Sequence, residues 1–209
     1  MSSLPNVLTV ARIALVPLFV GGFFLPGYSA RWIVFVLFCA AGITDAFDGM
    51  IARKWNAESS FGRMLDPIAD KLIVSAALLM LAADGTLKGI HLIPALVILC
   101  REILVSGLRE FLAGAHVSLP VTRVAKMKTV VQMVAIGALI ASSATEFMFP
   151  GVTDLALIGM WLAAALTMYT GYAYLQAGLR HAWSAPTSQP RSPPRPSKSP
   201  EHRPEHRTA

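Results

Sequence analysis

Six long apolar segments alternate with short polar stretches along the 209-residue chain. They cover about residues 8–25, 32–50, 67–83, 90–112, 129–145 and 153–177. Each approaches the roughly 20 apolar residues that a helix needs to cross a bilayer. The composition agrees, since 55% of the residues are hydrophobic and only 14% are charged, against roughly a quarter charged in soluble domains. The pattern predicts an all-α integral membrane protein with six transmembrane helices.

Basic residues fall in alternate connections between these segments. Arginines and lysines that follow segments two, four and six are Arg53, Lys54, Arg63, Arg123, Lys126, Lys128 and Arg180. The other connections hold only Arg31 and Lys88. Because short loops rich in lysine and arginine stay on the cytoplasmic side, we expect both termini to be cytoplasmic. The connection between segments two and three then faces the cytoplasm as well.

The chain divides into a six-helix membrane domain, residues 1–183, and a tail, residues 184–209. The tail is rich in proline, arginine and serine, and such a composition cannot bury a core, so we expect it to be disordered. It carries much of the formal net charge of +6. This charge therefore does not indicate nucleic acid, which we do not expect as a partner; weak attraction to anionic membrane lipids is the alternative to a merely solvated tail.

Four aspartates lie where the second apolar segment ends and the third begins. Asp45 and Asp48 are spaced i, i+3, and Asp66 and Asp70 are spaced i, i+4, so each pair occupies one helical face. The intervening linker is long enough for the two helices to stand antiparallel with these faces opposed. Because a carboxylate in hydrocarbon is costly, the sequence predicts that the four converge on one pocket at the membrane surface, together with a compensating partner.

A divalent cation is the partner that this ligand set favours. Oxygen ligands without His or Cys suit Mg²⁺, Mn²⁺ or Ca²⁺, and carboxylates combined with phosphate are typical of Mg²⁺. Two carboxylate pairs predict two ions, Mg²⁺ or Mn²⁺, and a metal pair is suited to clamping the oxygens of a transferred phosphoryl group. The plainer alternative is that the aspartates are loop charges beside a membrane, which does not require matched helical spacing on both sides.

Small residues and one arginine accompany the aspartates. Gly49, Ala52 and Gly62 leave room where a bulky ligand must approach the backbone closely. Arg53 is a fixed cation whose planar guanidinium can bind phosphate through two hydrogen bonds. These residues predict a phosphate-containing ligand beside the aspartates.

The acidic and small residues together read D-x-x-D-G-x-x-A-R-x8-G-x-x-x-D-x-x-x-D. This pattern resembles the signature of the CDP-alcohol phosphatidyltransferases, integral membrane enzymes with six transmembrane helices. The stretches LPNVLTVARI, REILVSGLRE and KMKTVVQM resemble bacterial members that use sn-glycerol 3-phosphate as acceptor. The resemblance covers about residues 4–177. It implies transfer of a phosphatidyl group from CDP-diacylglycerol to an alcohol, with release of CMP, in phospholipid biosynthesis at the bacterial cytoplasmic (inner) membrane.

The resemblance also implies roles for the residues of the motif. Asp45, Asp48 and Asp66 would bind metal. Asp70 would share the second ion and act as the general base. The residues that would line the CDP moiety are Gly49, Ala52, Arg53 and Gly62.

A second group of ionisable residues lies on the fourth and fifth segments. Arg101 and Arg109 are eight residues apart and share a helical face, and an ionisable residue inside a span is a functional-site hypothesis by default. Lys126 and Lys128 begin the fifth segment. The four cations predict a basic pocket for the acceptor's phosphate, which sn-glycerol 3-phosphate carries and a neutral alcohol does not.

Each of these charges also has a plainer interpretation. The arginines would neutralise Glu102 and Glu110 on the same segment, and the lysines would only mark the cytoplasmic end of a span. Three further polar residues, Thr9, Arg12 and Gln132, would complete a polar rim around the site.

Other functions fit parts of the pattern. Family members with another acceptor, of the cardiolipin, inositol or serine type, would share the motif, and an assay with each alcohol separates them. An intramembrane prenyltransferase also holds Mg²⁺ between aspartate pairs, but the Gly-Ala-Arg-Gly pattern argues against it. A transporter would use the acids as coupling-ion sites, yet the chain lacks matched, interrupted halves. Small residues of the last segment, Gly159, Ala163 and Ala164, permit a homodimer.

Overall fold

The computed structural model describes residues 4–55, 60–114 and 123–184, and it describes the side chains in these ranges except at 4–8, 45–55, 60–64, 66–67, 123, 173, 177 and 179–184. Every regular element in the described ranges is helical. The elements are α1 (Leu4–Phe23), α2 (Tyr28–Trp55), α3 (Ser60–Ala83), the 3₁₀-helix η1 (Gly89–His91), α4 (Leu92–Gly114), α5 (Arg123–Thr145) and α6 (Val152–Ser184). The tail predicted at 184–209 lies outside the described residues from position 185 onward.

The six apolar segments are confirmed as helices, one segment to each of α1–α6. The predicted bounds of the second and third helices are wrong, however, because α2 continues to Trp55 and α3 already begins at Ser60. Gly49 and Gly62 therefore both lie inside helices. A glycine inside a helix costs only about 1 kcal/mol relative to alanine, which the surrounding helix formers can offset.

Three helical segments are long and apolar enough to cross a membrane: Gly89–Gly114, Val124–Thr145 and Val152–Gln176. Two shorter apolar helical segments are Thr9–Phe23 and Tyr28–Thr44. The described part of the chain is thus all-helical, with three helical segments apolar and long enough to span a membrane. Six complete spans and cytoplasmic termini stay predictions, since length and composition support three spans among the residues described.

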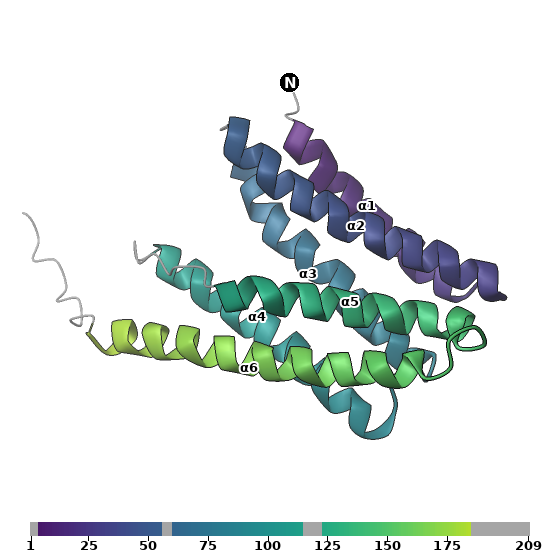
Figure 1. Cartoon of the computed structure of the whole chain (residues 1–209). Coiled ribbons are helices and arrows are strands. Elements are labelled where there is room, and N and C mark those ends of the chain that lie inside the picture. Colours follow the sequence, from purple (N-terminus) through teal and green to yellow (C-terminus); the bar gives the residue numbers. More distant parts are fainter. Residues whose placement is uncertain (1–3, 56–59, 115–122, 185–209) are drawn as a thin grey trace, which may run out of the picture.

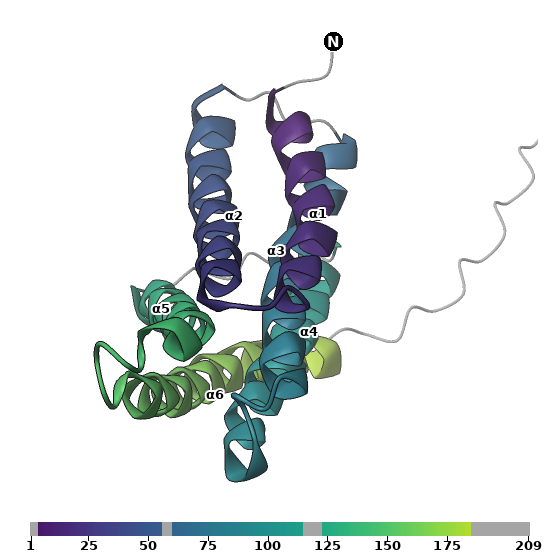
Figure 2. The same cartoon turned by 90° about the vertical axis from the view of Figure 1, so that its right-hand side faces the viewer.

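The helices form two groups that share one core. Helix α1 packs against α2 and α3, while α6 packs against α4 and α5, and α5 also contacts α2. Figures 1 and 2 show α1 beside α2, and α5 beside α6, with α3 and α4 completing the bundle. Buried side chains from all six α-helices form the core, among them Phe19, Phe38, Leu81, Ile98, Ile136 and Met160.

The small residues of α6 are used inside the chain. Ala163 and Ala164 are buried, and a Cβ at Gly159 would lie 3.1 Å from Cβ of Ala135 on α5. Close approach of α5 and α6 therefore explains Gly159, because small side chains let helix backbones come together, and the two alanines belong to the core of the bundle. They do not provide a free surface for a second copy, so the homodimer prediction loses the feature that suggested it.

Candidate functional site

The acidic motif occupies the end of α2 and the beginning of α3. Asp45 and Asp48 lie in the second half of α2, and Asp66 and Asp70 lie in the first half of α3, so each pair is confirmed to lie on one helix at the predicted spacing. The side chains of Asp45, Asp48, Asp66, Gly49, Ala52, Arg53 and Gly62 lie outside the described residues. No group of three metal-ligating side chains occurs among the side chains that are described, and the convergence of the four carboxylates stays a prediction.

Asp70 is the aspartate of the motif whose side chain is described. It is exposed, and its Oδ2 lies 3.9 Å from Nζ of the neighbouring Lys71. It lines three cavities: an inner pocket between α3, α4 and α5, a wider charged pocket beside it, and an apolar groove between α2 and α5. A carboxylate at this junction can contact both a polar ligand and the head of a lipid.

The charged pocket brings together all four cations that the sequence assigned to it. Its cationic side chains are Lys71, Arg101, Arg109, Lys126 and Lys128, and its carboxylates are Asp70, Glu102 and Glu110. Residues of α3, α4, α5 and α6 contribute to the wall. Five cations against three carboxylates leave an excess of positive charge that suits a phosphate dianion.

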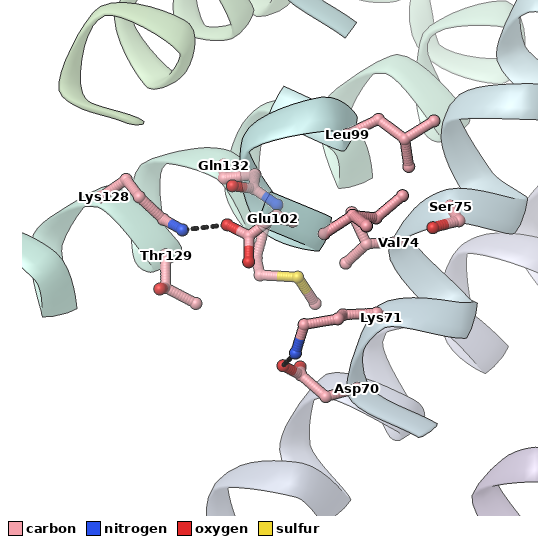
Figure 3. Close-up of a pocket in the computed structure, with 11 residues that line it drawn as sticks. Asp70, Lys71, Val74, Ser75, Leu99, Glu102, Lys128, Thr129 and Gln132 are labelled. Carbon is pink, nitrogen blue, oxygen red and sulfur yellow. Dashed lines mark hydrogen bonds and ion pairs between the residues drawn. The ribbon is translucent and has the colours of Figure 1, made fainter. Parts of the chain in front are cut away.

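Glu102 joins two of the cations at the floor of this pocket. Its Oε1 accepts a hydrogen bond from Nζ of Lys128 and lies 3.5 Å from a terminal guanidinium nitrogen of Arg101. Figure 3 shows Lys128 reaching from α5 toward Glu102, with Asp70 and Lys71 on the other side of the inner pocket. Lys128 is only 5% exposed. The expectation that both lysines sit at the water boundary thus fits Lys126, which is exposed, but not Lys128.

Arg101 and Arg109 both approach the ring of Tyr174 on α6. Each guanidinium carbon lies 6.0 Å from the ring centroid, within the range where a cation interacts with an aromatic face. Helix α6 thereby supplies a wall of the charged pocket, which the sequence did not predict. The two arginines share one face of α4, as their spacing indicated.

The residues proposed as a polar rim are buried. Thr9, Arg12 and Gln132 are 3%, 2% and 3% exposed. Gln132 lines the inner pocket beside Asp70 and Glu102, and Arg12 lines the apolar groove. Gln132 and Arg12 therefore line cavities from inside the bundle rather than form an exposed rim, and Thr9 lines none of the three cavities.

The apolar groove follows α5 between Thr129, close to Asp70, and Thr145. At a rise of 1.5 Å per residue this stretch of helix is about 24 Å long. Aromatic and small side chains line it, including Phe35 and Phe38 from α2 and Val134, Ala138 and Ala141 from α5. The polar side chains in its wall include Asp70 and Arg12. Such a surface, apolar along its length and charged at Asp70, suits an amphiphilic ligand with an apolar chain and a polar head.

Sequence reasoning missed three residues that line or support the charged pocket: Lys71, Thr170 and Tyr174. Lys71 follows Asp70 directly, so its position next to the acidic motif could have indicated that it lies at the site. Thr170 and Tyr174 lie in an apolar segment without a motif, and only the packing of α6 on α4 brings them to the site.

The comparisons with known proteins agree with one another on the protein family. The model of one protein family, CDP-alcohol phosphatidyltransferase, matches residues 2–169. A Rickettsia felis protein named CDP-diacylglycerol--glycerol-3-phosphate 3-phosphatidyltransferase is 47% identical over 178 residues, which is 84% of this chain and 94% of that protein. Proteins of the same name from Rickettsia typhi and Cereibacter sphaeroides are 48% and 38% identical, each over 85% of this chain and over 97% and 96% of their own lengths.

Proposed function

The chain belongs to the CDP-alcohol phosphatidyltransferase family, and from this premise we propose that it transfers the phosphatidyl group of CDP-diacylglycerol to sn-glycerol 3-phosphate. The products are CMP and phosphatidylglycerophosphate. Two of the relatives above carry this activity in their name at 47–48% identity. The observation that carries the proposal is the position of Asp70, where a charged pocket and an apolar groove meet.

The charged pocket takes the acceptor. The phosphate of glycerol 3-phosphate carries close to two negative charges near neutral pH, and the pocket has two more cations than carboxylates. Charge-assisted hydrogen bonds from arginine and lysine are roughly twice as strong as neutral ones. Inositol and serine lack this phosphate, so the excess charge favours glycerol 3-phosphate among the acceptors of the family.

Asp70 acts as the general base. The free primary hydroxyl of the acceptor attacks the phosphorus that bears the diacylglycerol, the bond from that phosphorus to the oxygen of CMP breaks, and the hydroxyl proton passes to the Asp70 carboxylate. Asp70 is exposed to the pockets, so an acceptor hydroxyl can reach it. A positioned base of this kind commonly contributes 10²–10⁴-fold in rate.

The apolar groove takes an acyl chain of the donor. It lies between α2 and α5, and α2 also carries Gly49, Ala52 and Arg53, which together with Gly62 would hold the cytidine diphosphate. A lipid with its chain along α5 would have its phosphates beside Asp70. This arrangement places the two substrates on different walls of one site.

Two divalent ions, Mg²⁺ or Mn²⁺, would be held by Asp45, Asp48, Asp66 and Asp70. The donor set fits such ions, since it contains only carboxylate oxygens, and Asp70, whose side chain is described, lines the pockets. When bound, the ions would neutralise charge on the diphosphate as the bond to CMP breaks. The metal is supported by this chemistry and by the family resemblance.

The proposed setting is the bacterial cytoplasmic membrane, with six spans, both termini in the cytoplasm and the site at the cytoplasmic surface. The distribution of lysine and arginine supports this orientation. The water-soluble acceptor would then reach the site from the cytoplasm, and the lipid donor would reach it from the bilayer.

The test is release of CMP by the purified protein from CDP-diacylglycerol and Mg²⁺ or Mn²⁺, with glycerol 3-phosphate, phosphatidylglycerol, inositol and serine offered separately. We expect CMP and phosphatidylglycerophosphate with glycerol 3-phosphate alone. Equal or greater CMP release with another alcohol would contradict the proposed acceptor, and absence of CMP release with all four would contradict the activity.

A further inference from the structure

The side chain of Arg101 on α4 is held by helix α6. Its Nε donates a hydrogen bond to the backbone carbonyl of Thr167 at 3.0 Å, and its Nη2 donates to Oγ1 of Thr170 at 2.8 Å. Both threonines are buried, at 0% and 4% exposure. Because a guanidinium is planar and rigid, two hydrogen bonds from different nitrogens fix its orientation.

The hydroxyl of Thr170 is arranged to accept this bond. Its own proton is directed back along α6, where Oγ1 lies 2.9 Å from the carbonyl of Leu166 and 3.2 Å from that of Thr167. A hydroxyl has one donor proton and two acceptor lone pairs, so with the proton on the helix a lone pair faces Arg101. Valine, which has the same shape without the oxygen, cannot replace this contact.

Gly171, the next residue, gives Arg101 the space to lie against α6. A Cβ at this position would lie 3.1 Å from both Cγ and Nε of Arg101. Such a separation is tighter than ordinary van der Waals contact, so any side chain here would push the arginine away. The glycine is buried in the middle of a long helix, where glycine is otherwise unfavourable.

The groups on α6 orient Arg101 without neutralising it. A carbonyl and a hydroxyl are uncharged acceptors, and the nearby carboxylate of Glu102 is shared with Lys128. Arg101 also lines the charged pocket, beside Arg109. Two guanidinium groups close together repel each other, and an anion between them relieves that repulsion. The geometry therefore keeps a fixed positive charge in the pocket.

We propose that Thr170 and Gly171 are positioning residues for the acceptor: they hold the Arg101 guanidinium at the wall of the charged pocket and thereby set the affinity for the acceptor's phosphate. This inference rests on the proposed function and extends it to α6. Neither residue touches the acceptor in this account; both act through Arg101.

Two pairs of matched variants test the inference. Thr170→Val removes the acceptor oxygen and keeps the shape, whereas Thr170→Ser keeps the oxygen. Gly171→Ala displaces Arg101, whereas Gly159→Ala adds the same methyl to the same helix at the same 3.1 Å separation, but against Ala135. The readouts are KM for glycerol 3-phosphate, KM for CDP-diacylglycerol and kcat, with the Kd of glycerol 3-phosphate measured by calorimetry in the absence of donor.

We expect Thr170→Val and Gly171→Ala to raise the KM and the Kd of glycerol 3-phosphate by about three- to thirtyfold, the range expected when a charged hydrogen-bonding group is displaced. The KM for CDP-diacylglycerol should stay within about twofold, and Thr170→Ser and Gly159→Ala should behave like the wild type. Gly171→Ala also keeps the test valid should Thr170→Val fail to fold.

Different failures have different meanings. If the wild type uses glycerol 3-phosphate but Thr170→Val and Gly171→Ala leave its KM and Kd unchanged, the inference is wrong and the proposed function stands. A parallel rise of both KM values, or an equal effect of Gly171→Ala and Gly159→Ala, also overturns it, because a general packing defect would act in that way. If the wild type neither binds glycerol 3-phosphate nor uses it, the proposed function fails and the inference fails with it.

Discussion

The acidic and basic halves of the site are built in opposite ways. The aspartates of the motif lie on two consecutive helices, α2 and α3, within one short stretch of chain. The charged pocket draws its side chains from α3, α4, α5 and α6, between Asp70 and Tyr174. The first arrangement is local in sequence and the second depends on the tertiary fold.

The two halves also differ in how their charge is balanced. The pocket contains its own counter-charges, since Glu102 binds Lys128 and lies close to Arg101. The motif residues from Asp45 to Asp70 include four aspartates and the basic Arg53, Lys54 and Arg63, yet only the aspartates repeat at helical spacing. We therefore expect the acidic half to depend on ions from outside and the basic half to be stable without them.

The largest effect should come from the acidic half. Replacing Asp45, Asp48 or Asp66 by alanine removes a metal ligand, and we expect CMP release to fall by at least about 10²–10³-fold, as is typical when a group that stabilises the transition state is lost. Excess EDTA should abolish activity, and added Mg²⁺ or Mn²⁺ should restore it. Full turnover in EDTA would show that the acidic half needs no ion.

A variant of Asp70 separates the role of general base from metal binding. Asp70→Asn cannot take the acceptor's proton, so kcat should fall by about 10²–10⁴-fold. The concentration of Mg²⁺ needed for half-maximal activity should change less than in Asp66→Ala, which serves as the comparison. Turnover close to that of the wild type would remove Asp70 from the role of base.

The two lysines of the basic half should contribute differently to the free energy of unfolding. Lys128→Met removes a buried cation that binds Glu102, so the free energy of unfolding should fall by roughly 1–3 kcal/mol. Lys126 is exposed, and Lys126→Ala should change it by no more than about 0.5 kcal/mol. Unfolding of both variants in the same detergent measures the difference. Equal stabilities would mean that the bond from Lys128 to Glu102 contributes nothing to the fold.

The smallest effect concerns the connection between α5 and α6. Oε1 of Glu146 accepts a hydrogen bond from the backbone N–H of Gly151, and its Oε2 accepts from Thr153. The hydrogen bond from the Thr153 side chain, followed by the backbone bonds, lowers the pKa of Glu146. A lowered pKa stabilises the fold at neutral pH, and this contribution is lost as the pH falls through the lowered pKa of the folded state.

Glu146→Gln should therefore have a slightly lower Tm than the wild type at neutral pH, and the difference should shrink on acidification. Both KM values should stay unchanged, because Glu146 lines neither pocket nor groove. A difference in Tm that grows as the pH falls would contradict the sign of the shift.

The helices that carry the local half of the site were predictable, and the non-local half was predictable only in part. Helical spacing placed the four aspartates correctly along α2 and α3, since i, i+3 and i, i+4 positions share a face whatever the rest of the fold does. The same rule placed Arg101 and Arg109 together. It could not show that Lys128 is buried against Glu102, because that contact joins two helices.

Other misses have similar physical causes. Thr170, Gly171 and Tyr174 carry no signal in an apolar segment, and they matter only because α6 packs on α4. The third apolar segment begins at about residue 67, which leaves Gly62 in the polar linker, whereas α3 already begins at Ser60, because a helix can extend beyond its apolar residues. The small residues of α6 suggested contact with another chain but lie inside this one, Gly159 against α5 and the alanines in the core, since small residues in a sequence do not indicate which helix they contact.

The central claim is that acceptor and donor occupy different cavities that meet at Asp70. The most direct measurement is of the KM for each substrate in two variants. Lys126→Ala changes the wall of the charged pocket, and Ala138→Phe fills the apolar groove. Lys88→Ala and Ala165→Phe, at exposed positions outside both cavities, are the matched controls. We expect Lys126→Ala to raise the KM for glycerol 3-phosphate about tenfold or more and leave the KM for CDP-diacylglycerol unchanged. Ala138→Phe should do the reverse, and the controls should do neither. If both variants raise the same KM, or neither differs from its control, the two cavities do not divide the substrates in this way.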